Sequence, residues 1–159
     1  MTTAIRTPRT SALASAALAT ILALGGCSTH TAKSYTYNVD TGDAIKIELD
    51  TTGGYDIDDE VPFTVTKDGE TVTQGTFLKG DEGYSLYSQQ VADDEDAEVI
   101  AEGEQGGNEY LFWSVDNDGT MEYDYVIRVK DSSTAVLLGS QAGEQEARDV
   151  FERMRITVD

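Results

Sequence analysis

The sequence predicts an α+β domain, in which an antiparallel β-sheet of about six to eight strands is covered by a C-terminal amphipathic helix. Two patterns support this fold class. After residue 34, apolar and polar residues alternate along most of the chain, as they do in strands with one buried face. Near the end of the chain, the apolar residues instead recur with a helical period. An all-β sandwich with an appended helix is the alternative that the same patterns allow.

The first half of the domain contains four segments with strand patterns. Apolar residues alternate with polar ones most clearly in the first two segments, and Asp68-Gly69 separates the last two. An Asp-Gly pair between two such segments is typical of a β-hairpin turn. The predicted strands lie at residues 35–39, 45–49, 63–65 and 72–77.

The second half contains a long predicted hairpin. Residues 108–115 are apolar on both faces, which is typical of a strand inside a sheet. Residues 117–119 (Asn-Asp-Gly) then turn the chain into residues 121–129, where apolar side chains alternate with mostly polar ones that include Asp124. Further strands, the first of them weakly patterned, are predicted at residues 84–91, 99–101 and 134–138.

The last segment of the chain is the predicted helix. Its apolar residues are spaced at i, i+3, i+4 and i+7 and therefore lie on one face: Ala147, Val150, Phe151 and Met154. Glutamates in the first turn and arginines in the last turn match the helix dipole. We expect this helix to cover one face of the sheet, with Met154 in the core.

The first 26 residues have the features of a secretory signal. They contain no acid, and Arg6 and Arg9 precede an apolar segment at residues 11–24 that is too short for a permanent membrane span, which needs roughly 20 residues. The segment ends in Leu24-Gly25-Gly26-Cys27, which resembles the lipobox of bacterial lipoproteins. Cys27 is the only cysteine of the chain.

This resemblance implies that the Cys27 thiol is linked to diacylglycerol and becomes the new N-terminus when the signal is removed. The chain then divides into a signal peptide at residues 1–26, a lipidated tether at residues 27–34 and one globular domain at residues 35–159. Several long acyl chains such as palmitate give stable membrane anchoring, whereas one chain is marginal. We expect the domain to face the extracytoplasmic side of a bacterial membrane, at the cell surface or in the periplasm.

Residues 43–159 resemble the PsbP/Mog1/DcrB-like domains in the order of their strands, the central aromatic hairpin and the closing helix. This set of domains includes bacterial lipoproteins, and its fold serves mainly as a binding or accessory module. The resemblance implies a role of that kind without indicating a ligand.

Composition excludes several kinds of chemistry. Removing residues 1–26 takes away two arginines and no acids, so 9 Lys and Arg remain against 30 Asp and Glu, a net charge of −21. Such a surface repels nucleic acid, which is bound through Lys and Arg. The single histidine, His30, lies in the tether, so the domain has no Ser-His-Asp or Cys-His site, and a zinc site is disfavoured. No glycine-rich phosphate-binding motif occurs.

Calcium is the one cofactor that the sequence suggests, because hard cations need clustered oxygen ligands. The segment around Asp118 looks like part of an EF-hand loop, but Ser114 and Tyr125 stand where that loop needs an acidic residue at each end. The candidate metal ligands fall in three clusters: Asp56, Asp58, Asp59 and Glu60; Asp93, Asp94 and Asp96; and Asp116 and Asp118.

Aromatic side chains are the second kind of candidate, since exposed aromatics often mark binding surfaces. Most of the tyrosines lie on the apolar face of a predicted strand, where packing explains them. Four are less committed to packing and are the candidate binding aromatics: Tyr55, Tyr84, Tyr87 and Tyr110.

These observations predict a non-enzymatic, membrane-anchored binding or accessory module of the cell envelope, with an unidentified envelope protein or glycan as its partner. Two alternatives remain. One is a calcium-dependent adhesion or interaction domain. The other is a small cell-wall hydrolase that uses two carboxylates on either side of a sugar.

Overall fold

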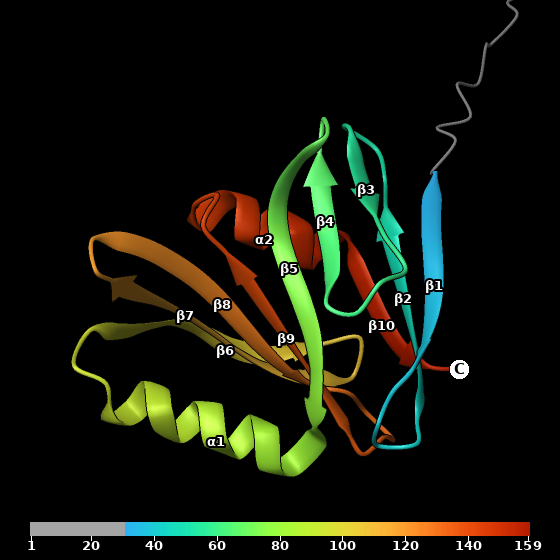
Figure 1. Ribbon diagram of the computed structural model, residues 1–159. Coiled ribbons are helices and arrows are strands. Elements are labelled where there is room, and N and C mark those ends of the chain that lie inside the picture. Colours follow the sequence, from blue (N-terminus) through green and yellow to red (C-terminus); the bar gives the residue numbers. More distant parts are fainter. Residues whose placement is uncertain (1–30) are drawn as a thin grey trace, which may run out of the picture.

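The computed structural model describes residues 31–159 and places them in two antiparallel sheets with two helices (Figure 1). The strands are β1 (Ala32–Asn38), β2 (Ala44–Asp50), β3 (Tyr55–Ile57), β4 (Phe63–Lys67), β5 (Glu70–Lys79), β6 (Ala97–Gln105), β7 (Asn108–Asn117), β8 (Thr120–Arg128), β9 (Thr134–Ser140) and β10 (Met154–Val158), and the helices are α1 (Gly80–Asp93) and α2 (Glu144–Arg153). The larger sheet has seven strands in the order β3-β4-β5-β9-β8-β7-β6, and the smaller has the order β1-β2-β10. The predicted α+β class and the antiparallel pairing are confirmed.

The larger sheet is apolar on both faces, and each face has its own cover. On one face, α1 packs over Leu111, Trp113 and Val126. On the other face, the smaller sheet and α2 share a core with the larger sheet, in which Tyr37 of β1 lies 5.5 Å from Phe63 of β4, measured between ring centroids. Figure 1 shows α1 and α2 on opposite sides of the larger sheet.

Helix α1 replaces the strand predicted at residues 84–91, so that prediction was wrong. Tyr84, Tyr87 and Val91 follow a helical period and pack against the sheet. Gly80 and Gly83 are poor helix formers, but they let the helix approach the sheet closely. A Cβ at residue 83 would lie only 2.8 Å from the Leu78 Cβ, so close packing decided this segment rather than local propensity.

Helix α2 forms where the helical period predicted it, but it is not the C-terminal element. It ends at Arg153, and Met154–Val158 forms β10, which pairs antiparallel with β2. Met154 is buried as expected, but as the first residue of this strand rather than in the last turn of the helix. Met154 and Ile156 are buried alternately with exposed Arg155, which is a strand pattern that the preceding helical stripe concealed.

The two hairpins predicted from Asp-Gly pairs are confirmed. Asp68 and Gly69 have φ values of 52° and 86°, and Asp118 and Gly119 have values of 55° and 86°. Positive φ at both central residues is the geometry of the type I′ turn, which matches the twist of the paired strands. Strand β7 is the predicted two-sided strand and lies second from the sheet edge, beside β6.

Asp43 joins the two sheets at one end of the molecule. Its carboxylate accepts hydrogen bonds from the Ser133 backbone N–H at 2.7 Å and from the Thr134 hydroxyl at 2.8 Å. These bonds stabilise the charged form and lower the pKa of Asp43 below its usual value. The turn between β1 and β2 is thereby attached to the start of β9.

We predict that Gly75→Ala destabilises the protein by about 1–3 kcal/mol, because overpacking of a filled core has that cost. Gly75 of β5 lies directly opposite Phe63 of β4, and a Cβ at residue 75 would come within 2.0 Å of the Phe63 ring. Urea denaturation measures the free energy of unfolding. As a control, Phe63→Leu in the same background should offset part of the loss, and strictly additive effects of the two substitutions would contradict this account.

Candidate functional site

The strongest candidate site is a hollow at one corner of the larger sheet. Strands β5 and β9 are paired as far as Gln74 and Gly139 and then diverge. Helix α1 starts at the opposite end of these two strands, where the Gly80 N–H donates to the Ser133 carbonyl. From there it runs away from the hollow's corner towards β6, which begins at Ala97 opposite Val115 of β7. The hollow has a volume of about 520 Å³. It is lined by Thr71, Val72, Thr73, Gln74, Glu122, Asp124, Gly139, Ser140, Gln141 and Ala142.

Asp124 is the key residue of this hollow. On β8 it shares a face with Val126, and its neighbours across the sheet are Trp113 on β7 and Gly139 on β9. Gly139 leaves room for the carboxylate, because a Cβ at residue 139 would lie 3.1 Å from Asp124 Oδ1. Within residues 31–159, the Asp124 carboxylate has neither a hydrogen-bond partner nor an ion-pair partner.

Burial raises the pKa of Asp124 to about 7, and the charge of nearby Glu122 adds to this effect. Both effects penalise the carboxylate form. The strand brings these two acids to the same face because they are two positions apart. Near neutral pH, Asp124 is therefore protonated in part of the molecules and ionised in the rest, so a ligand or a small change in pH can shift its protonation state.

The other polar groups of the hollow fall into two sets. Glu122 accepts a hydrogen bond from Gln141 Nε2 at 2.6 Å, and Ser140 Oγ donates to the Val72 carbonyl at 2.6 Å, so these groups are engaged. The Thr73 hydroxyl is buried and, among the described residues, has no hydrogen-bond partner. None of the described residues that line the hollow is Lys or Arg. The site thus offers a carboxylate and neutral oxygens without any positive charge.

The acidic clusters predicted as metal sites do not form such a site. In the part of the chain that the structure describes, no three acidic, His or Cys side chains come together as metal ligands. In each cluster, at least one carboxylate accepts a hydrogen bond from a backbone N–H a few residues further along the chain. Asp58 Oδ1 accepts from Thr64 N at 3.0 Å, Asp94 Oδ1 from Asp96 N at 2.9 Å, and Asp116 Oδ1 from Gly119 N at 2.7 Å.

The remaining acids of these clusters are also separated. Asp56 forms an ion pair with Lys33 at 2.7 Å, which lowers the pKa of Asp56. Asp59, Glu60, Asp93 and Asp96 are exposed on turns or on α1, and Asp118 occupies the hairpin turn at positive φ. These acidic residues therefore stabilise turns or lie exposed to solvent.

The four candidate aromatics pack in different places rather than on one surface. Tyr55 is buried, with the Lys67 and Arg153 cations 4.9 Å and 4.4 Å from its ring centroid, and its hydroxyl donates to Glu146. Tyr84 lies against the Arg128 guanidinium and Tyr87 against Trp113. Tyr110 packs against Phe151. Each ring is used to attach one element to another.

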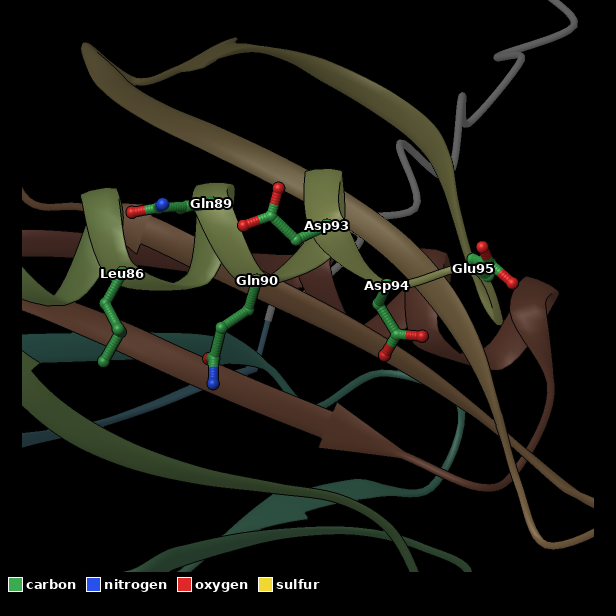
Figure 2. A pocket seen from close by; sticks show the side chains of 6 residues that line it. All are labelled: Leu86, Gln89, Gln90, Asp93, Asp94 and Glu95. Atoms are coloured by element: carbon green, nitrogen blue, oxygen red, sulfur yellow. The ribbon is translucent and has the colours of Figure 1, made fainter.

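A second hollow, of about 490 Å³, lies at the C-terminal half of α1 (Figure 2). Leu86, Gln90 and Asp94 point to the same side of the helix, whereas Glu95 lies apart from them. Leu86 is 55% exposed, and the Asp94 carboxylate is engaged in its turn. The polar groups do not converge, so this hollow is a weaker candidate than the one around Asp124.

Asp124 was not singled out by the sequence analysis, although a signal was present. It occupies a strand predicted to pair with the two-sided apolar segment at residues 108–115, and the structure places Trp113 opposite it. A carboxylate on that face of an interior strand is unusual, because charged groups are rarely buried without a partner. The pattern of alternation alone only grouped it with the polar residues of its strand.

No protein-family model matches the chain, and no curated protein matches it with significance. The proposed lipidation residue, Cys27, lies outside the described residues. Within residues 31–159, neither helix has the length and apolar character needed to cross a bilayer.

We predict that Asp124→Asn makes the protein more stable at pH 8 but not at pH 3.5. The pKa of Asp124 in the folded protein lies above its value of 3.8 in the unfolded chain, so the unfolded chain loses this proton first as the pH rises. Stability therefore falls between about pH 4 and pH 7, by on the order of 4 kcal/mol, and Asp124→Asn removes this fall.

Urea denaturation across this pH range checks the prediction, with an expected gain for Asp124→Asn of about 2–4 kcal/mol at pH 8. Glu104→Gln is the matched control, since Glu104 is an exposed acid on β6, and its pH profile should follow that of the unsubstituted protein. An unchanged profile in Asp124→Asn would show that Asp124 is not held neutral by the fold.

Proposed function

We propose that this chain is a membrane-anchored, non-enzymatic binding module of a bacterial cell envelope, and that the hollow around Asp124 is its ligand site. The observation that carries this proposal is a carboxylate turned into a hollow of about 520 Å³ without a partner in the described chain. Such a group destabilises the fold at neutral pH, and groups with this property concentrate at functional sites. The volume lies within the ordinary range for small-ligand sites.

The start of the domain fits attachment close to a bilayer. Strand β1 begins at Ala32, and both the N–H and the hydroxyl of Thr51 donate to the Thr31 carbonyl. Thr31 follows Cys27 by four residues, which span at most about 14 Å when extended. A lipid on Cys27 would therefore hold the loop around Thr51 near the membrane surface, with the ligand site within the same envelope layer.

We predict that radiolabelled palmitate enters the protein in bacterial cells and that Cys27→Ala moves the protein from the membrane fraction to the soluble fraction. In the same cells, a photo-crosslinking residue at Gln74, an exposed residue that lines the hollow, should form adducts with an envelope component. The same residue at Glu104 on β6 should not. Absence of palmitate together with unchanged fractionation of Cys27→Ala contradicts the anchor, and equal adducts at both positions contradict the ligand site.

The same hollow supports one other candidate function, a carboxylate-dependent glycan hydrolase. Residues two apart on a strand are separated by about 7 Å, which is within the spacing that glycosidase carboxylates use. Asp124, with its pKa raised to about 7, has the property of a general acid, and Glu122 would be its partner.

For this second function we expect purified protein to release reducing ends from cell-wall glycan at a rate that falls by at least about a hundredfold in either Asp124→Asn or Glu122→Gln. Glu104→Gln should keep full activity. If no reducing ends are released by the unsubstituted protein, the hydrolase is excluded and the binding function stands.

A further inference from the structure

We infer that the hollow around Asp124 binds an organic cation, with a primary ammonium group of the ligand paired to the Asp124 carboxylate. This inference rests on the proposed function of the hollow as a ligand site and adds the class of ligand. It follows from the charges that line the hollow, from the hydrogen-bond acceptors that the hollow leaves unused, and from its volume.

The lining charges are all negative. Asp124 and Glu122 are the titratable residues among the ten that line the hollow from β5, β8 and β9, and β7 places the uncharged Trp113 beside Asp124. Glu122 already accepts a hydrogen bond from Gln141, so Asp124 is the carboxylate that remains available. An anionic ligand would meet two like charges, whereas a cation would supply the counter-charge that the described chain does not.

The unused polar groups match the donors of an ammonium ion. An ammonium group has three N–H donors and no acceptor. The Asp124 carboxylate offers two oxygen acceptors. The Thr73 hydroxyl is not counted with them, because Thr73 pairs with Val65 and points to the other face of the sheet, whereas Gln74 pairs with Gly139 on the face of Asp124. Gln74, which is exposed at the mouth, adds a side-chain amide oxygen. Three oxygen acceptors are thus available for three donors.

A metal ion fits these groups less well than an organic cation. Calcium takes six to eight oxygen ligands, usually with several carboxylates. Within the described residues, no cluster of three potential metal ligands includes Asp124 and Glu122. The hollow is also far larger than one ion requires, and its volume of about 520 Å³ leaves room for the rest of an organic molecule.

Binding of a cation should depend on pH in a defined direction. The ammonium group pairs with the ionised carboxylate, and burial keeps much of Asp124 protonated below pH 7. Glu122 is the other titratable group that lines the hollow, and it strengthens this effect through its negative charge. Affinity should therefore rise as the pH increases from 6 to 8, and binding should release a proton from Asp124.

The test uses full-length protein purified from membranes in detergent, labelled with ¹⁵N, and titrated with Nα-acetyl-lysine methylamide at pH 8. The Nε-acetylated form of the same molecule is the neutral control. We expect saturable shifts of the Gln74 and Gly139 amide signals with the charged probe and at least tenfold weaker binding of the neutral probe. Asp124→Asn should weaken binding of the charged probe at least tenfold, and Glu104→Gln should leave it unchanged.

Several outcomes would overturn the inference. Equal binding of both probes would mean that the hollow takes neutral ligands, in which case the proposed binding function survives and the cation does not. Millimolar calcium that displaces the probe as well as a second amine does would mean a site without preference for an organic cation. No shift with either probe, combined with Gln74 adducts in cells, would also exclude an amine while leaving the ligand site in place. No shift and no Gln74 adducts would remove both proposals.

Discussion

The larger sheet is apolar on both faces, and the rest of the architecture follows from the need to cover both. Phe112 and Trp113 are adjacent on β7 and point to opposite faces, and both are almost completely buried. A sheet of this kind needs a layer on each side, since exposed apolar faces of this size are unfavourable in water. Helix α1 supplies one layer, and the smaller sheet with α2 supplies the other. The first strand, β1, and the last strand, β10, therefore pair with opposite edges of β2, and residues distant in the sequence complete the same core.

The cover on the α1 side is incomplete, and this explains where the hollow lies. A single helix of 14 residues crosses the sheet from the end of β5 towards β6. The start of β5 and the end of β9 remain beyond its reach, and these two strands diverge there after Gln74 and Gly139. A corner of the sheet is thus neither covered by a helix nor closed by backbone pairing. Asp124 lies at the margin of this corner, buried by the neighbouring strands on one side and open to the hollow on the other.

Local patterns predicted most of the strands, both Asp-Gly hairpins and the position of α2, because alternation and turn chemistry are properties of short segments. They did not predict α1, where Gly80 and Gly83 lower helix propensity but permit close contact with the sheet. They did not predict β10 either, because Met154 fits both the helical stripe before it and the strand that it begins. The hollow was beyond sequence reasoning because it arises where the pairing of β5 and β9 stops, at Gln74 and Gly139, which are more than 60 positions apart in the sequence. Of the candidate site residues, the acidic clusters and tyrosines are used in turns and packing, whereas Asp124 was counted only among the polar residues of its strand.

The position of Asp124 is costly, and the cost bears on why a carboxylate occupies it. Asn has nearly the same shape and would avoid the penalty of burying a charge, so packing alone does not account for an acid at this position. Residues 27–159 also carry an excess of 21 negative charges, which raises the local concentration of cations around the domain and repels anions. A half-buried carboxylate inside such a field is stabilised by an arriving positive group more than by any rearrangement of its own surroundings, because none of the described residues that line the hollow is basic. The negative surface and the unpaired Asp124 thus favour the same kind of ligand. A cation that pairs with Asp124 would remove the penalty of the partner-less carboxylate and so stabilise the folded protein.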